Sequence, residues 1–201
     1  MTHITSLCVY CGASTGLSPQ YANAARTLAA TMVEQHIGLV YGGGNIGLMG
    51  VIADEVLRLG GEVTGVIPTI LVDKEVAHIS LTQLHVVDTM HQRKAMMAEL
   101  ADGFIAMPGG FGTLEELFEV ITWSQLALHD KPIGLLNTDG FYDGLIAFIE
   151  HMQGQGFLRE HHRELLMHDV DPAALLARMQ QFEPGKIEKL LSPAKAKSLL
   201  Q

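Results

Sequence analysis

The sequence predicts an α/β protein in which helices cover both faces of a doubly wound, mostly parallel sheet. Three observations lead to this fold class: short apolar, β-rich runs alternate with longer helical patterns, glycine-rich loops follow several of these runs, and 48% of the 201 residues are hydrophobic. Alternating strands and helices are typical of βαβ units, in which helices bury a parallel sheet. We expect one domain over residues 1–183 and a basic tail over residues 184–201.

Six strands and five longer helices are expected, in alternating order. The strands lie near residues 4–10, 38–41, 62–67, 82–87, 102–106 and 132–136. The helices lie near residues 19–36, 47–58, 89–100, 112–127 and 142–152. The strand runs are continuously apolar, which indicates burial on both faces. After residue 153, Gly154 and Gly156 interrupt the pattern, and only shorter helices are expected there.

The composition argues against two kinds of partner. A net charge of −9 at pH 7 disfavours general binding to nucleic acid, which needs clustered Lys and Arg against the phosphates. No apolar run reaches the roughly 18 residues that a membrane span requires. The first four residues, Met-Thr-His-Ile, lack the basic start and apolar stretch of a signal peptide. We therefore expect a cytoplasmic protein without membrane or nucleic-acid partners.

Cys8 and Cys11 form a C-x-x-C pattern. A redox pair of this kind opens a helix, whereas Cys8 lies inside an apolar strand-like run. The chain has no second cysteine pair that could complete a zinc site. Reduced, mostly buried thiols are expected, and no metal site is expected among the scattered histidines.

Glycine-rich or polar loops follow four of the expected strands, at residues 12–16, 42–47, 88–94 and 108–113. In doubly wound sheets, ligands bind beyond the carboxyl ends of the strands. The four loops are therefore expected to converge on one edge of the sheet and to form the binding site.

Residues 42–47 satisfy the G-x-G-x-x-G pattern between a strand and a helix, which raises the possibility of a dinucleotide cofactor. That fingerprint requires an acidic residue at the end of the next strand, where this chain has Val66-Ile67-Pro68. NAD is therefore disfavoured, and no cofactor is expected. Gly47 and Gly50 have an alternative reading as packing glycines, whereas Gly43, Gly44 and Asn45 are expected to face a ligand.

The segment Pro108 to Glu116 is the stronger signal. Gly109, Gly110 and Gly112 allow the backbone to approach a ligand closely, and Thr113 can both cap the following helix and present a hydroxyl. A helix start offers amide N–H groups and a positive dipole end, which suit a phosphate. The segment lacks the lysine of triphosphate-binding loops, so we expect a monophosphate.

Glu116 has two readings. Thr113-Leu114-Glu115-Glu116 fits the capping box, in which the glutamate only closes the helix start. The helix itself is apolar on two sides. One side carries Leu114, Leu117, Phe118, Ile121 and Gln125, and the other carries Glu116, Val120, Trp123 and Ala127. One side would cover the sheet and the other would meet a second subunit, which places Glu116 near both the phosphate loop and a dimer interface.

Thr89 and Gln92 form a second possible capping box and place Arg93 and Lys94 near the first turn of their helix. Cations are disfavoured at the positive end of a helix unless an anion is close. A phosphate or a carboxylate would be the natural partner, although two solvated basic residues remain an alternative.

Segments 42–50, 90–94 and 108–116 together resemble the LONELY GUY family of cytokinin-activating phosphoribohydrolases, over about residues 8–152. The resemblance implies a Rossmann-like homodimer that hydrolyses the N-glycosidic bond of an N6-substituted adenosine 5′-monophosphate, without metal or cofactor. Arg93 and Glu116 match the catalytic residues of the family. The implied substrate-binding residues are Ser14, Gly43, Gly44, Asn45, Glu75, Met90, Lys94, Pro108, Gly109, Gly110, Gly112 and Thr113. Proteins of this family have often been labelled lysine decarboxylases, a label that no residue context in this chain supports.

The implied residue types suit the chemistry. Breaking a ribosyl C–N bond develops positive charge on the sugar, and a carboxylate such as Glu116 stabilises it and can orient the attacking water. Arg93 could hold the phosphate or ribose, orient Glu116 or keep it ionised. Two alternatives stay open: plain AMP as the substrate, and a carrier or sensor that binds a nucleotide without turnover.

Overall fold

The computed structural model describes residues 3–72 and 77–183. Glu75 and the expected tail over residues 184–201 lie outside the described residues. The described strands form one parallel sheet of seven strands in the order β4-β3-β2-β1-β5-β6-β7. The strands are β1 (Ser6–Tyr10), β2 (Gly38–Tyr41), β3 (Val63–Pro68), β4 (Gln83–Val87), β5 (Gly103–Ala106), β6 (Ile133–Leu136) and β7 (Leu166–Asp169).

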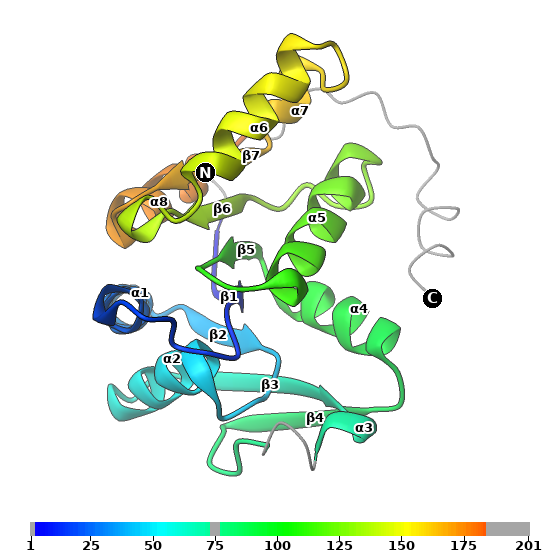
Figure 1. The fold of residues 1–201 in the computed structure, drawn as a ribbon. Helices are drawn as coiled ribbons and strands as arrows, with labels where there is room; N and C mark the ends of the chain where they lie inside the picture. Colours follow the sequence, from blue (N-terminus) through cyan, green and yellow to red (C-terminus); the bar gives the residue numbers. More distant parts are fainter. Residues whose placement is uncertain (1–2, 73–76, 184–201) are drawn as a thin grey trace.

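Helices cover both faces of this sheet (Figure 1). One face packs against α1 (Pro19–Glu34), α2 (Gly47–Arg58) and α8 (Pro172–Gln180). The other face packs against α4 (Met90–Leu100), α5 (Phe111–Gln125) and α6 (Asp143–Gly154). Three short elements complete the described chain: α3 (Thr69–Val72), the 3₁₀ turn η1 (Thr138–Gly140) and α7 (Glu160–Arg163). The predicted Rossmann-like α/β class is confirmed.

The central strand β1 shows why the strand runs are apolar throughout. Leu7 and Val9 point into the core beneath α1 and α2, whereas Cys8 and Tyr10 point into the core beneath α4 and α5. Successive side chains of a strand alternate between the faces, so a strand covered on both sides needs apolar residues at every position. Cys11 belongs to the α1 side, opposite Cys8, and both thiols are buried and free, as expected.

Two parts of the sheet differ from the sequence prediction. β7 is a seventh strand where only short helices were expected; its Leu166 and Met167 are buried, but its last two residues are partly exposed, so the apolar run is too short to predict a strand. β4 forms the opposite edge, and Val86 is 56% exposed. An edge strand lacks one neighbour and part of the helical cover, which hydropathy alone does not reveal.

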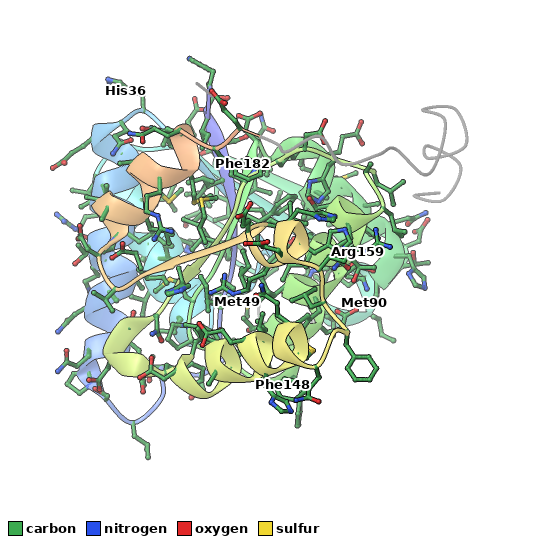
Figure 2. The ribbon with its side chains drawn as sticks, turned by 90° about the horizontal axis from the view of Figure 1, so that it is seen from above. His36, Met49, Met90, Phe148, Arg159 and Phe182 are labelled. Carbon is green, nitrogen blue, oxygen red and sulfur yellow. The ribbon has the colours of Figure 1, made fainter. Side chains whose placement is uncertain are left out.

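The order of the strands places the functional edge. β1 pairs with β2 on one side and with β5 on the other. From β1 the chain runs outward through β2 and β3 to β4, and from β5 it runs in the opposite direction through β6 to β7. The carboxyl ends of β1 and β5 therefore form the topological switch point, where doubly wound sheets bind ligands. Side chains fill the space between sheet and helices; Figure 2 shows Met49 in the interior and Phe148 at the periphery on α6.

At the amino end of the sheet, Asp102 ties the start of β5 to the start of β1. Its Oδ2 accepts hydrogen bonds from the backbone N–H of Thr5 at 2.8 Å and of Ser6 at 3.1 Å, and from both hydroxyl groups. Burial opposes ionisation of Asp102, but these hydrogen bonds outweigh it and hold its pKa below the ordinary value.

We expect Asp102→Asn to lower the free energy of unfolding at pH 7 by about 1 kcal/mol, since hydrogen bonds to a partly exposed charged group are weakened. A carboxyl group whose pKa is lowered by folding stabilises the protein above its unfolded pKa and stops doing so as the pH falls through its folded pKa. The difference from wild type should therefore shrink below about pH 4. Urea unfolding at pH 7 and pH 3 measures it; a constant difference would contradict the assignment.

Candidate functional site

The loops after β1, β2 and β5 touch one another, as predicted. Gly12 N–H donates to Pro108 O at 3.0 Å, and Leu48 N–H donates to Gly12 O at 2.9 Å. Gly47 has a φ of +59°, and a side chain there would collide with the backbone of Ala13. The packing interpretation of Gly47 is therefore correct, although it packs against the loop after β1.

Arg93 joins a fourth segment to this edge. The capping box that opens α4 is present: Gln92 N–H donates to Thr89 Oγ1 at 3.1 Å, and Thr89 N–H donates back to Gln92 Oε1 at 3.2 Å. The cap orients the first turn so that Arg93, only 6% exposed, reaches under the strand ends. Its Nε donates to Val66 O at 3.2 Å and its Nη2 donates to Gly42 O at 3.1 Å.

Gly42 has no side chain because the guanidinium group of Arg93 occupies that place. Strand-end carbonyl groups beyond the ladder need donors, and a buried cation needs partial negative charge close by. Arg93 satisfies both requirements and fixes α4 to β2 and β3. The sulfur of Met90, a predicted substrate-binding residue, lies 3.9 Å from Arg93 Nη1.

Lys94 points to α5. Its Nζ donates to Glu115 at 2.6 Å and to Glu119 at 2.9 Å, and the side chain is 11% exposed. Burial opposes the charge of Lys94, but the two carboxylates outweigh it and keep its pKa above the ordinary value. The sequence predicted a phosphate or a carboxylate as the partner of Lys94. The structure shows two carboxylates, and these ion pairs tie α4 to α5.

The expected phosphate loop leads directly into α5, but the helix begins earlier than predicted. Its N-cap is Gly110 and its first residue is Phe111. Thr113 is therefore already the third helical residue and does not cap the helix, so the capping-box interpretation of Thr113 and Glu116 is wrong. Instead, the Thr113 side chain is buried against Gly109.

The start of α5 is suited to an anion. The first intrahelical hydrogen bond runs from Leu114 N–H to Gly110 O at 3.1 Å, so the amides of residues 111–113 lie ahead of the helical ladder, at the positive end of the dipole. A Cβ atom added at Gly110 or Gly112 would meet no protein atom within 4 Å. Packing therefore does not require glycine at these two positions, and the surface beside the helix start is open to a ligand.

Glu116 lies one turn further along α5 and is half-buried. Burial raises the pKa of the Cys8 and Cys11 thiols well above the ordinary value, and the charge of Glu116 raises both further. The charge of Arg93 acts on Cys8 in the opposite sense. Both charges thus act on the thiol of Cys8 in β1, and the two predicted catalytic residues lie on α4 and α5, the helices that cover this face of the sheet.

The division of α5 into two faces was partly wrong. The side chains that face the sheet are those of Thr113, Leu117, Val120 and Ser124. Leu117 and Val120 were assigned to opposite sides, but residues three apart lie only about 60° from each other around a helix. Phe111 is 93% exposed and Phe118 is 37% exposed on the outer side.

The outer side of α5 forms one wall of an apolar groove of about 270 Å³. The groove is lined by Phe118, Ile121, Thr122, Gln125, Ile149, Met152, Phe157, Leu158, His162, Arg163 and Leu166. An apolar outer face on α5 was expected from the sequence, and the groove contains three members of one predicted side, Phe118, Ile121 and Gln125, whereas Leu117 of that side faces the sheet.

Two other predicted residues lie at the rim of this edge. Ser14 and Asn45 are exposed, and Ser14 Oγ accepts a hydrogen bond from Gly16 N–H at 3.2 Å. Tyr142 was missed by sequence reasoning: its hydroxyl donates to Met107 O at 2.6 Å, directly before the segment 108–116. The signal was its position just beyond the sixth expected strand, the same rule that located the other loops.

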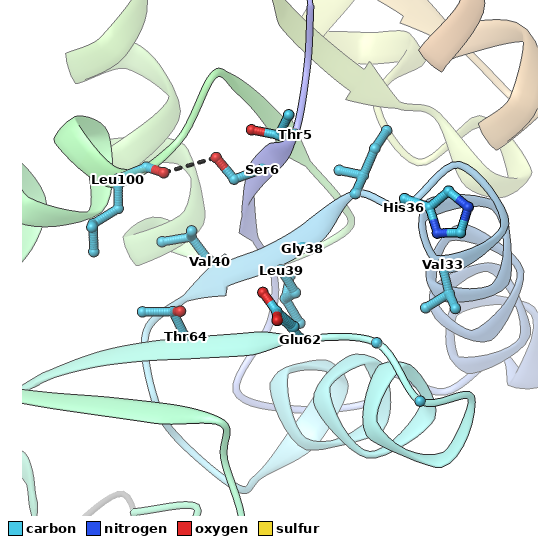
Figure 3. A pocket seen from close by; sticks show the side chains of 13 residues that line it. Thr5, Ser6, Val33, His36, Gly38, Leu39, Val40, Glu62, Thr64 and Leu100 are labelled. Atoms are coloured by element: carbon cyan, nitrogen blue, oxygen red, sulfur yellow. Dashed lines mark hydrogen bonds between the residues drawn. The ribbon is translucent and has the colours of Figure 1, made fainter.

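A cavity of about 590 Å³ lies at the opposite end of the sheet. Figure 3 shows it around the start of β2, between Thr5, His36, Glu62 and Leu100. It lies at the amino ends of the strands and contains none of the predicted site residues. Among the described residues, no group of three His, Cys, Asp or Glu side chains is placed to hold a metal ion.

Comparison with known proteins identifies the family. A family profile described as "Possible lysine decarboxylase" matches residues 49–179. The cytokinin riboside 5′-monophosphate phosphoribohydrolase LOG2 of Arabidopsis thaliana is 48% identical over 178 residues, which cover 89% of this chain and 84% of that protein. The chain belongs to the LOG family. The LOG protein of Oryza sativa subsp. japonica is 47% identical, over 89% of this chain and 74% of that protein.

Solved structures agree on the fold. The molybdenum cofactor carrier protein of Chlamydomonas reinhardtii has a TM-score of 0.68 at 18% identity, covering 89% of this chain and 98% of that one. The molybdenum cofactor binding protein of Rippkaea orientalis has a TM-score of 0.66 at 18% identity, with 90% and 98% covered. At this identity the likeness shows the shared fold alone.

The description as a possible lysine decarboxylase does not suit the lysine of this LOG-family site. A Schiff base with pyridoxal phosphate needs a neutral amine, whereas Lys94 is held as a cation between two carboxylates.

No helix among residues 3–72 and 77–183 is long and apolar enough to cross a bilayer.

Gly112→Ala tests whether an anion contacts the start of α5. Alanine is favoured over glycine in a helix by up to about 1 kcal/mol, so Tm should rise by about 2–4 °C. Affinity for AMP should nevertheless fall at least about tenfold, because a methyl group blocks close approach of the phosphate. Calorimetry measures both quantities.

Gly144→Ala is the matched control. Gly144 is the second residue of α6, as Gly112 is of α5, and a Cβ added there also meets no atom within 4 Å. It should raise Tm without changing AMP affinity. Unchanged AMP affinity in Gly112→Ala would mean that no phosphate lies against this turn.

Proposed function

We propose that this protein hydrolyses the N-glycosidic bond of an adenosine 5′-monophosphate, N6-substituted or plain, and releases the free base and ribose 5-phosphate. The observation that carries the proposal is the open start of α5, which suits a phosphate, on the same face of the sheet as the buried Arg93 and as Glu116, whose charges both act on Cys8. The names of relatives at 47–48% identity support the same reaction class.

The phosphate is placed at residues 110–113, where amide groups and the dipole of α5 supply positive potential without a lysine. The ribose then lies over the end of β1, between this turn and the glycine loop after β2. The exposed residues Met90, Ser14 and Asn45 are assigned to the rim of that space, and the backbone of Gly43, Gly44, Pro108 and Gly109 is assigned to its floor.

In the reaction, a water oxygen bonds to C1′ of the ribose while the bond from C1′ to the base nitrogen breaks. One proton of that water goes to the departing base, and the hydroxyl stays on C1′. The sugar carries positive charge in the transition state, and a carboxylate beside it stabilises that charge and orients the water. Glu116 is assigned this role.

Arg93 is assigned to hold the site together and to bind the nucleotide. Its Nε and Nη2 are committed to Val66 and Gly42, which fixes the guanidinium plane at the strand ends. A guanidinium group has five N–H donors in a rigid fork, so a fixed plane also gives fixed directions toward ribose or phosphate oxygens.

Lys94, predicted to bind the substrate, contributes to the proposed site through its ion pairs with α5. Its two carboxylate partners lie on α5, next to Glu116, so the lysine sets the position of α5 against α4. On α4, Arg93 directly precedes Lys94. On α5, Glu116 directly follows Glu115, so the ion pair between Lys94 and Glu115 lies beside both proposed catalytic residues. Glu75 is retained as a substrate-binding residue on the family resemblance.

A homodimer is part of the proposal. Phe111 and Phe118 expose apolar surface on α5, next to the groove formed with α6 and α7. Exposed apolar patches of this kind mark interfaces, and a two-fold dimer buries the same patch on both subunits. Because Glu116 lies on the same helix, the active sites would lie close to the interface.

The cytoplasmic location expected from the sequence also stays part of the proposal.

Incubation with AMP and with isopentenyl-AMP, followed by chromatography, should detect free base and ribose 5-phosphate. Glu116→Gln should lower kcat at least about 100-fold while AMP affinity changes less than about threefold, because the amide keeps the shape but loses the charge. Glu99→Gln, at the far end of α4, should behave as wild type. A wild-type protein that binds AMP but releases no base from either nucleotide would instead be a carrier or sensor.

Phe118→Glu should convert the dimer to a monomer, because the charge would have to be buried between the subunits. Light scattering measures the mass, and we expect turnover to fall about tenfold as the nearby site loosens. Val170→Glu, in the turn between β7 and α8, places the same charge on another exposed apolar residue and should remain dimeric. A fully active dimer of Phe118→Glu would place the interface elsewhere.

A further inference from the structure

A short segment between α3 and β4 lies along the glycine loop that follows β2. We call residues 77–80 the strap. Ala77 forms an isolated antiparallel bridge with Gly44, and His78 N–H donates to Gly43 O at 3.0 Å. The strap therefore contacts the proposed nucleotide-binding loop through backbone groups of both segments.

His78 anchors the strap to α2. The residue is 5% exposed, and its Nε2 lies 2.9 Å from Asp54 Oδ1. Its Nδ1 accepts a hydrogen bond from Ser80 N–H at 3.3 Å, so the ring proton is on Nε2 and is donated to Asp54. Both ring nitrogens of His78 are thus engaged, one within the strap and one with the neighbouring helix.

The imidazole is the buried part of the strap. Ile79 is 93% exposed and Ser80 is exposed, so apolar burial does not hold the segment in place. The hydrogen bond of His78 to Asp54 attaches the strap to α2, and a bond to a carboxylate is of the stronger, charge-assisted kind; the bond from Ser80 N–H orients the imidazole ring within the strap.

The contact with Gly43 has a direct geometric consequence. A peptide unit is planar and trans, so its C=O and N–H groups point in opposite directions. Anchoring Gly43 O on the strap turns the N–H of Gly44 away from the strap. Gly43 itself has a φ of +76°, and Gly43 and Gly44 have no side chains to fix their own peptide planes.

We propose that His78 is a positioning residue for nucleotide binding. Its bond to Asp54 holds the strap where His78 N–H can donate to Gly43 O. This hydrogen bond sets the direction in which the Gly44 N–H and the following Asn45 face the substrate. The assignment rests on the proposed function, because it takes the glycine loop as part of the nucleotide site.

The test compares two His78 variants with wild type. His78→Phe keeps a ring of similar size but loses both side-chain hydrogen bonds. His78→Asn loses the bond to Asp54, but its side-chain oxygen can still accept from Ser80 N–H, as in an Asx turn. Glu55→Gln is the matched control, since it breaks the 2.6 Å ion pair with Arg58 on the same helix without touching the strap.

We expect KM for the nucleotide to rise five- to tenfold in His78→Phe while kcat changes less than threefold, and we expect His78→Asn to recover part of the KM. Calorimetric Kd values for AMP should follow the same order, and Glu55→Gln should match wild type. Unchanged KM and Kd in His78→Phe, or a loss of kcat that parallels a fall in Tm at constant KM, would overturn the assignment.

The calorimetric measurement keeps the two proposals separable. Absence of turnover in the wild-type protein contradicts the proposed hydrolase activity alone, and the Kd series still decides the role of His78. Normal turnover with no effect of His78→Phe contradicts the positioning role alone.

Discussion

The site depends on one buried cation beneath the ends of two parallel strands. Arg93 donates to the carbonyl groups of Gly42, which follows β2, and of Val66, which lies in β3 beyond the last β2–β3 pair, so it supplies hydrogen bonds where this ladder has ended and places α4 relative to the sheet. Gly42 must be glycine to admit the guanidinium group, and the Thr89 cap must orient the first turn of α4. A residue with a catalytic role in the proposal is thus also a structural tie, and loss of Arg93 is expected to affect folding and turnover together.

The sequence was sufficient for the parts of the fold that are buried on both faces. β5 and the last four residues of β1 are buried throughout because cores lie on both sides, and the glycine loops follow these strands by a general rule of doubly wound sheets. β7 escaped prediction because only Leu166 and Met167 are buried at that edge. The start of α5 was misplaced because Thr113 fits a cap, whereas the cap is the backbone of Gly110.

The site was predicted where chemistry lies in short motifs and missed where it depends on distant contacts. The R-K pair and the segment 108–116 singled out Arg93 and Glu116, which lie on the two helices that cover the Cys8 face of the sheet; their catalytic roles stay a prediction. The partners of Lys94 are 21 and 25 residues further along the chain, so no local pattern could assign them. His78 lies in a segment without a recognisable motif, and its role depends on a backbone contact that sequence does not encode locally.

The start of α5 has a consequence for how the site responds to acidity. Its positive potential comes from amide groups and a helix dipole, and the nearby lysine is occupied by Glu115 and Glu119. Amide groups do not titrate in the physiological range. Capture of a phosphate monoester at this turn should therefore follow the second ionisation of the ligand, near pH 6, because the turn itself keeps the same potential as the proton concentration changes.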